Sequence, residues 1–426
     1  MIKRNFYTGM RYSFLTIFIL AFFLFSCERE PVFEEIEYVK YSHQLFEENT
    51  KMGELIQKAS REFGATPKEM LLKAGYNEAQ AQQLLERLNL YVALSKDYTV
   101  HGFAYNTKDP LGESVVASGL LYCPQNRLPK GVIFVYPFFK SKGESGTDNR
   151  YSVESLLAVA GDYVCMIPDG IGMGLNSDQP MSIIQHENLA ETGVDFYLAA
   201  REFIYNRYHY KLPRRIILFG YSLGGSAIWS LARYLSIHKE SDISVKDIFV
   251  GGGPYYPDLC MEDLFETRYS EYASGPFILW SLNYYDNLNL DFTKIFKGKL
   301  LEEFPELCDG SRAVPDVTSY IGTDLNDYFD EDFLGNKENQ YRQLVMEALK
   351  KHSIPNDWRP DVKVRLYNCH KDLYVPSICG DKLYAYLKEI NADVEYIHED
   401  IAHEKMIVRM IMDFYKYLYP NQPMYP

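Results

Sequence analysis

The sequence lacks the features that identify several common functional classes. None of its 7 cysteines stands in a Cys-x-x-Cys pair, and no His-x-x-x-His pair occurs, so no metal site is predicted. Its 44 lysines and arginines are outnumbered by 58 aspartates and glutamates, which gives a net charge of −14. Because phosphate contacts need clustered cations, nucleic acid is not an expected partner.

The N-terminal part of the sequence also lacks an apolar run long enough to cross a membrane as a helix. The run from Phe14 to Phe25 is too short for this. It follows Lys3, Arg4 and Arg11 and is followed by Cys27, an order typical of a secretory signal.

The end of this segment, Leu24-Phe25-Ser26-Cys27, resembles a bacterial lipobox, with the bulky Phe25 as a departure. We therefore predict a signal peptide over residues 1–26, cleavage before Cys27 and lipidation of its thiol. The protein would then be an exported lipoprotein on a cell-envelope membrane, with residues 27–41 as a tether. The alternative is an ordinary signal peptide followed by an incidental cysteine.

The remaining cysteines do not form an obvious disulfide framework. Export permits disulfides, but the 6 cysteines that follow Cys27 are scattered along the chain. Cys165 falls in a predicted strand and is expected to be a core thiol. Cys260 and Cys308 lie in one inserted region and could form a bridge.

Residues 42–95 have a helical pattern. Apolar residues recur there at spacings of three, four and seven, at Leu45, Met52, Leu55, Ala59 and Phe63. Thr66 and Glu69 form a capping box, and Gly75 is placed to end that helix. We expect a small helical N-terminal unit, without the basic face that DNA binding would require.

Strand and helix patterns alternate through most of the remaining chain. Two antiparallel strands are predicted first, at 97–106 and 114–122. The later strands are predicted at 132–136, 163–167, 215–219, 247–251, 362–367 and 394–398, with helices at 152–160, 186–205, 226–238, 376–390 and 404–417. Such alternation predicts an α/β fold with a mostly parallel sheet flanked by helices, whose active site lies at the carboxyl ends of the strands.

The alternation stops between residues 255 and 360, a segment rich in tyrosine, phenylalanine, leucine and aspartate. Because a structureless loop of that length is improbable, we expect a mostly helical cap over the sheet edge. The core would then consist of residues 96–254 and 361–426.

A Gly-x-Ser-x-Gly segment, Gly220 to Gly224, stands between a predicted strand and a predicted helix. In that context a serine is forced into a sharp turn that holds its hydroxyl clear of the sheet, and only small neighbours fit. Ser222 is therefore the predicted nucleophile. A glycine-rich packing turn is the alternative interpretation.

A serine nucleophile needs a base, and the base needs an acid that orients it. His403 follows the last predicted strand and is the expected base, whereas His398 lies inside that strand. Asp372 follows the preceding strand and is the expected acid, with Asp400 as the alternative. His370 is expected only to shape the loop.

An oxyanion hole requires two N–H donors. The backbone N–H of Leu223 is one expected donor. The other should come from the loop after residues 132–136, where Pro137 has no N–H to offer. Phe138 is the first choice and Phe139 the second.

The order Ser222, Asp372, His403, with Gly-x-Ser-x-Gly and a cap, resembles the α/β-hydrolase family over residues 97–426. The segments at 167–174 (Ile-Pro-Asp-Gly-Ile-Gly-Met-Gly) and 251–254 (Gly-Gly-Gly-Pro) resemble its secretory-lipase-like branch. A departure is Tyr136-Pro137-Phe138, where many members have His-Gly. Asp169 is expected to support a loop.

Members of that branch hydrolyse carboxylic esters, often lipids, and no cofactor is expected. The resemblance thus implies a serine esterase or lipase-like enzyme that acts through an acyl-enzyme. Two alternatives stay open: a serine peptidase of the same fold, and a non-catalytic protein that binds a glycan on its aromatic cap.

Overall fold

A central β-sheet organises the chain. The computed structural model describes residues 40–420, apart from 52, 55–56, 59–65, 74, 95–96, 151, 160–161 and 239–241. The predicted signal peptide and Cys27 lie outside this part. Among the helices that are described, none is both long and apolar enough to cross a membrane.

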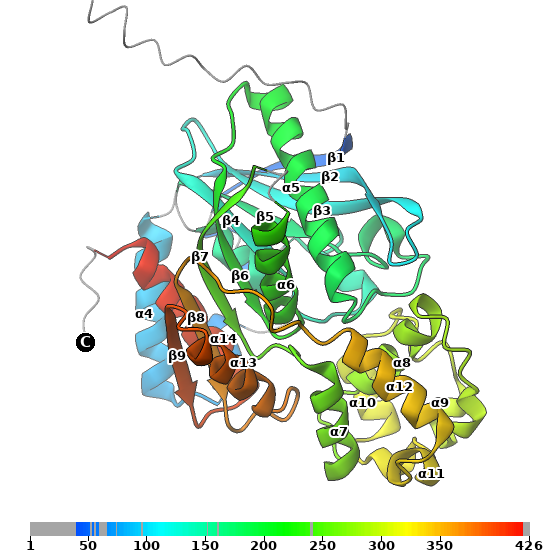
Figure 1. Cartoon of the computed structure of the whole chain (residues 1–426). Helices are drawn as coiled ribbons and strands as arrows, with labels where there is room; N and C mark the ends of the chain where they lie inside the picture. The colour runs from blue at the N-terminus through cyan, green and yellow to red at the C-terminus, as the bar shows by residue number, and fades with distance from the viewer. Residues whose placement is uncertain are drawn as a thin grey trace, which may run out of the picture. The chain divides into compact units, whose positions relative to one another are not determined.

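The described residues contain nine strands in the order β1-β2-β3-β5-β4-β6-β7-β8-β9 (Figure 1). Their bounds are β1 Tyr41–Thr50, β2 Tyr98–Lys108, β3 Ser114–Pro124, β4 Gly131–Tyr136, β5 Tyr163–Pro168, β6 Arg215–Tyr221, β7 Ser244–Gly251, β8 Val364–Cys369 and β9 Val394–Glu399. The first three pairings, from β1 to β5, are antiparallel, and the remaining pairings are parallel. The central strands read as continuous apolar runs because both of their faces are covered.

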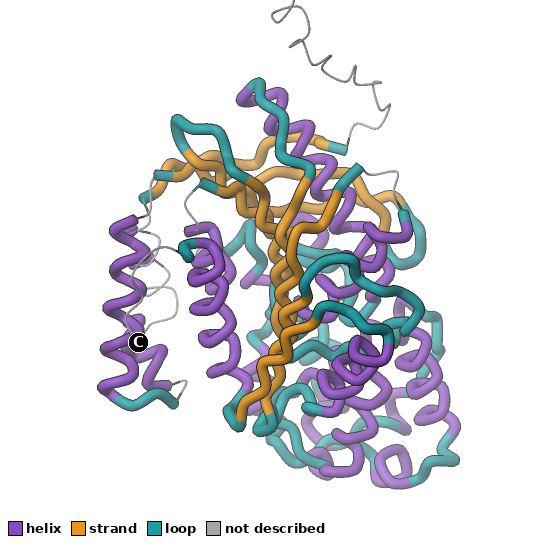
Figure 2. Tube along the Cα trace, turned by 60° about the vertical axis from the view of Figure 1, so that its left-hand side comes forward, coloured by secondary structure: helices purple, strands orange, loops and turns teal. Residues whose placement is uncertain are grey.

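Helices cover both faces of this sheet, which Figure 2 shows nearly edge-on. One face packs against α5 His186–Tyr208, α6 Leu223–Ile237 and α13 Ile378–Glu389. The other packs against α14 His403–Leu418 and the 3-10 helix η2 Val153–Val159. The predicted α/β fold is therefore confirmed, with each predicted strand and helix from residue 97 to 251 and from 362 to 417 found close to its expected position.

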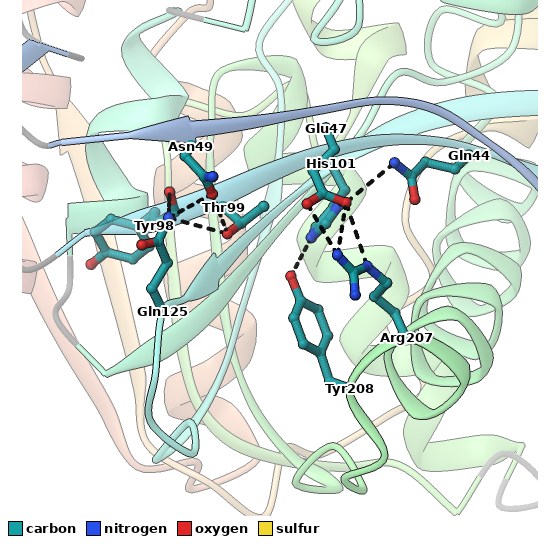
Figure 3. A network of polar contacts seen from close by, with 9 residues as sticks. All are labelled: Gln44, Glu47, Asn49, Tyr98, Thr99, His101, Gln125, Arg207 and Tyr208. Atoms are coloured by element: carbon teal, nitrogen blue, oxygen red, sulfur yellow. Dashed lines mark hydrogen bonds and ion pairs between the residues drawn. The ribbon is translucent and has the colours of Figure 1, made fainter.

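The helical prediction for the start of residues 42–95 is wrong, because Tyr41–Thr50 is the edge strand β1. Two register irregularities in its pairing with β2 interrupt the alternation that would have marked a strand. Polar contacts hold it in place (Figure 3): Glu47 forms an ion pair with Arg207 of α5 and lies 3.7 Å from His101 of β2.

The later part of that unit is helical, with α3 Pro67–Lys73 and α4 Glu78–Leu94. The predicted capping box is present, since Thr66 N–H donates to Glu69 Oε2 at 2.6 Å and Glu69 N–H donates to Thr66 Oγ1 at 3.2 Å. Gly75, with φ of +83°, follows the end of α3 as expected. Met52, Leu55, Ala59 and Phe63 lie outside the described residues.

The segment between residues 255 and 360, which we call the insertion, is mostly helical, as predicted. It contains α7 Pro257–Thr267, α8 Ser274–Tyr285, α9 Gly298–Glu302, α10 Val314–Ile321, α11 Glu331–Gly335 and α12 Gln340–Lys351. These helices share an apolar cluster of their own, which also takes in Met181, Ile183 and Ile184 from the segment before α5. Cys308 is buried in this cluster, whereas Cys260 contacts Cys379, so the bridge that Cys260 and Cys308 could have formed is not present.

A buried histidine connects the end of the insertion to the core. His186 Nδ1 lies 2.7 Å from the carbonyl oxygen of His352, and its Nε2 lies 2.9 Å from Ser226 Oγ. Because a carbonyl only accepts, Nδ1 carries the proton of the neutral ring and Nε2 accepts. Burial lowers the pKa of His186 to about 4.

This buried imidazole should make the protein less stable in mild acid. The unfolded chain binds a proton near pH 6.5 and the folded chain only near pH 4, so the stabilisation is complete above pH 6.5 and declines as the pH falls towards 4. Between pH 7.5 and 5 the loss from His186 should be about 2 kcal/mol in the free energy of unfolding. Urea denaturation at both pH values measures it.

His186→Gln is the variant that isolates this contribution. Its stability should change with pH by about 2 kcal/mol less than that of the wild type. The same substitution at the exposed His43 controls for the loss of one histidine. An identical pH dependence in the wild type and His186→Gln would show that the buried ring does not titrate as described.

Candidate active site

The Gly-x-Ser-x-Gly segment forms a sharp turn between β6 and α6. Ser222 has φ of 57° and ψ of −133°, which residues other than glycine rarely adopt. A Cβ on Gly220 would lie 2.1 Å from the carbonyl oxygen of Gly224, and one on Gly224 would lie 2.2 Å from that of Tyr136. The two glycines therefore let the turn pack tightly, and the serine stands at its tip.

The predicted acid and base are joined by a hydrogen bond. Asp372 lies in the loop after β8, and His403 is the first residue of α14. His403 Nδ1 is 2.6 Å from Asp372 Oδ2, and both side chains are buried. Since a carboxylate accepts, Nδ1 carries the proton, which leaves Nε2 free to act as a base.

Asp372 is held by three further donors. Its Oδ1 accepts from the backbone N–H groups of Tyr374 at 2.9 Å and Val375 at 2.8 Å. Its Oδ2 also accepts from the thiol of Cys369 at 3.2 Å. Burial raises the pKa of this thiol, which keeps it a donor. The carboxylate is thus fixed on both oxygens and oriented towards His403.

Among the residues that the structure describes, Cys369, Asp372 and His403 are also close enough together to hold a metal ion. Cys369 Sγ, an Asp372 oxygen and a His403 nitrogen all lie within 4.8 Å of one another. In this structure they bond to each other, which is the arrangement that an acid–base pair requires.

Ser222 and His403 line one pocket. Tyr221, the elbow residue before the serine, contacts the histidine: its ring centroid is 4.7 Å from the imidazole, and its hydroxyl donates to the His403 carbonyl oxygen at 2.8 Å. The structure gives no hydrogen bond between Ser222 Oγ and the imidazole. Such bonds are often long without substrate.

The pocket has a volume of about 370 Å³ and is mostly apolar. Its walls come from the elbow, the loop after β4, the insertion and the Asp372 loop, with Phe139, Ile183, Met261, Leu264, Ile278 and Val375 among the apolar residues. Asp263 and Glu404 add carboxylates, and no lysine or arginine is among the residues that line it. The site therefore offers an apolar environment with a negative electrostatic bias.

The structure changes the choice of the second oxyanion donor. The backbone N–H of Phe138 donates to Glu154 Oε1 at 3.3 Å, so this N–H is already engaged. Glu154 also forms a buried ion pair with Lys140 at 2.7 Å. Phe138 and Phe139 both line the pocket, as does Leu223, which begins α6, so the two candidates differ in that the structure gives an acceptor only for the Phe138 N–H. Phe139 thus replaces Phe138 as the candidate donor.

The alternative acid and base residues lie apart from this arrangement. Asp400 is exposed and forms an ion pair with Lys371 at 2.9 Å. His370 and His398 are exposed and their rings are in contact, with centroids 3.7 Å apart and planes tilted by 45°. None of the three alternatives lines the pocket, and neither does Lys371.

Asp169 supports a loop, as expected. It is buried and accepts hydrogen bonds from the hydroxyls of Ser118 at 2.5 Å and Thr147 at 2.6 Å, and from the Thr147 N–H at 3.1 Å. Burial nevertheless raises its pKa. Its partners are structural groups, so it ties β3 to the loops at the carboxyl end of the sheet.

Sequence reasoning missed three residues that shape the site: Glu154, Cys369 and Tyr221. Glu154 and Tyr221 act through contacts with residues that are distant along the chain. Cys369 acts locally, because it stands only three residues before Asp372 at the end of β8. That position was the one signal that could have pointed to it.

Comparison with known proteins gives structural neighbours only, since no family model and no curated protein sequence matches the chain. A protein described as a hydrolase from Legionella pneumophila aligns at TM-score 0.65 and 21% identity, over 82% of this chain and 97% of its own. The rice cell wall degrading esterase LipA from Xanthomonas oryzae aligns at TM-score 0.66 and 17% identity, over 78% and 92%. The chain has an α/β-hydrolase fold.

Candida antarctica lipase A in its closed state is a more distant structural match, at TM-score 0.56 and 14% identity, over 77% of this chain and 79% of that one. At these identities the likeness establishes the fold. In α/β-hydrolases a Gly-x-Ser-x-Gly elbow exposes a serine above the sheet, and the acid and histidine follow in that order. In this chain Ser222 stands at the elbow, and Asp372 and His403 follow it in the same order.

Proposed function

We propose that this α/β-hydrolase is a serine hydrolase that cleaves carboxylic esters through an acyl-enzyme. The observation that carries the proposal is the 2.6 Å hydrogen bond between Asp372 and His403, beside a pocket that also contains the strained Ser222. The esterase and lipase among its structural neighbours support the same class of reaction.

In the first half of the reaction, Ser222 Oγ attacks the ester carbonyl carbon while His403 Nε2 takes its proton. The imidazolium that forms is stabilised by the Asp372 carboxylate. The tetrahedral oxyanion then expels the alcohol, which receives the proton from His403, and the acyl group remains on Ser222. Water activated by the same imidazole releases the carboxylic acid.

The developing oxyanion needs donors beside the elbow. The N–H of Leu223, at the start of α6, and the N–H of Phe139 are the proposed pair. Glu154 positions the second one indirectly, because it holds the neighbouring Phe138 N–H and Lys140 on the same loop. Each such donor contributes roughly 10²–10³ to kcat in enzymes of this kind.

The pocket also indicates which esters fit. Its apolar walls favour hydrocarbon acyl or alcohol groups, and burial of an unpaired carboxylate there would be costly. Asp263 and Glu404 would repel an anion as well. The proposed substrate is therefore a neutral or cationic ester. The signal predicted at residues 1–26 would place the enzyme on a cell-envelope membrane, attached through Cys27.

A matched pair of substrates tests this specificity. 4-Nitrophenyl pentanoate should be hydrolysed with a kcat/KM at least about 30-fold above that of mono-4-nitrophenyl glutarate, which carries a carboxylate at the end of the same chain. Asp263→Asn should lower the ratio of the two kcat/KM values, whereas Asp400→Asn, outside the pocket, should leave that ratio unchanged. Faster hydrolysis of the anionic ester would contradict the proposed substrate class.

The same assay separates the alternatives. A peptidase would cleave pentanoyl 4-nitroanilide or aminoacyl anilides in preference to the ester, and a non-catalytic glycan-binding protein would cleave neither. Absence of turnover on every ester would contradict the proposed activity itself.

A further inference from the structure

Two cysteines from different parts of the chain meet beside the pocket. Cys260 lies on α7 of the insertion and Cys379 on α13 of the core, 119 positions apart. Their Sγ atoms are 2.8 Å apart, closer than unbonded sulfur atoms ordinarily pack. A disulfide has an S–S distance of about 2.05 Å. A relative movement of less than about 1 Å would therefore bring the two sulfurs to bonding distance.

The surroundings favour this pair over any other. Among the cysteines in the described part of the chain, it is the one contact between two sulfur atoms. Cys379 is completely buried, and Cys260 is partly exposed on the pocket wall. An oxidant can thus reach the sulfur of Cys260. The buried sulfur of Cys379 lies beside it, in position to attack the mixed disulfide that forms there.

We propose that Cys260 and Cys379 form a disulfide that ties α7 of the insertion to α13 of the core. The Cys260 thiolate attacks a low-molecular-weight disulfide such as oxidised glutathione, forms a mixed disulfide and releases one glutathione thiolate. The Cys379 thiolate then attacks the Cys260 sulfur and releases the second. The two cysteines lose two protons and two electrons, and oxidised glutathione becomes two molecules of reduced glutathione.

The link would hold two walls of the pocket together. Cys260 and Met261 line the pocket from α7. On the other side, α13 begins two residues after Pro376, at the end of the loop that carries Asp372 and Val375. A covalent bond between these helices therefore fixes the insertion against the segment that holds the catalytic acid. It also restricts the unfolded chain, because it closes a long loop.

Peptide mapping tests the bond directly. The purified protein is incubated with oxidised glutathione, denatured without reductant, alkylated with iodoacetamide and digested. We expect one cross-linked peptide pair that contains Cys260 and Cys379, with Cys123, Cys165, Cys308 and Cys369 alkylated. Alkylation of both Cys260 and Cys379, or a cross-link from Cys260 to Cys308, would overturn the proposal. The mapping does not depend on enzymatic activity.

Thermal unfolding tests the role of the link. The oxidised wild type should lose about 5–10 °C in Tm on reduction, given the length of the closed loop. Cys260→Ser and Cys379→Ser should have the lower Tm with or without reductant. Cys308→Ser serves as the matched control and should keep the response of the wild type. A wild-type Tm that does not respond to reduction would contradict a stabilising link.

Discussion

Replacement of Ser222 by alanine is expected to lower kcat on 4-nitrophenyl pentanoate by about 10⁴-fold or more, with the fold retained. The variant loses the oxygen that forms the acyl-enzyme, and His403 then has only water to activate. Alanine removes no hydrogen bond that the structure gives to this side chain, so the thermal midpoint should stay close to that of the wild type. Steady-state kinetics and thermal unfolding on the same preparation measure both.

Ser274 provides a matched control for this substitution. It also lines the pocket, but it begins α8 of the insertion and has no place in the proposed reaction. Ser274→Ala should retain kcat within a few-fold of the wild type. If Ser222→Ala and Ser274→Ala were equally active, the elbow serine would not be the nucleophile.

Replacement of Asp372 by asparagine is expected to lower kcat by about 10³–10⁴-fold. The amide oxygen can still accept from the N–H groups of Tyr374 and Val375, so the loop should keep its conformation. What is lost is the negative charge that stabilises the imidazolium and holds the Nδ1–H tautomer of His403. Kinetics at neutral pH measure the loss, and thermal unfolding confirms that the variant is folded.

Asp400→Asn is the control for this second prediction, because Asp400 was the alternative acid and is exposed beside Lys371. Its kcat should be nearly that of the wild type. A large loss in Asp400→Asn with little loss in Asp372→Asn would reverse the assignment of the acid.

Much of the fold could be predicted because its signals are local. The apolar runs of β4 and β6 and the long pattern of α5 depend only on neighbouring residues. β1 could not be recognised in this way. It pairs with β2 some 50 residues later in the chain, and its two irregularities break the period-two pattern.

The same distinction applies to the site. Ser222 could be predicted as the nucleophile from a motif whose glycines the turn requires, and Asp372 and His403 could be predicted as acid and base from their positions after successive strands. We now prefer Phe139 to Phe138 as the second oxyanion donor, because the Phe138 N–H donates to Glu154, which lies 16 positions away and leaves no sequence signal. The pairing of Cys260 with Cys379 was missed for the same reason: it depends on how the insertion packs against α13.

The central claim is that the hydroxyl of Ser222 is activated for attack by the Asp372–His403 pair. Reaction with a fluorophosphonate probe, followed by mass mapping of the adduct, tests it most directly, because only an activated serine reacts readily with such a probe. We predict one adduct, on Ser222, and no labelling of Ser222→Ala or of heat-denatured protein. Failure of the native wild type to react, or an adduct on another residue, would contradict the account.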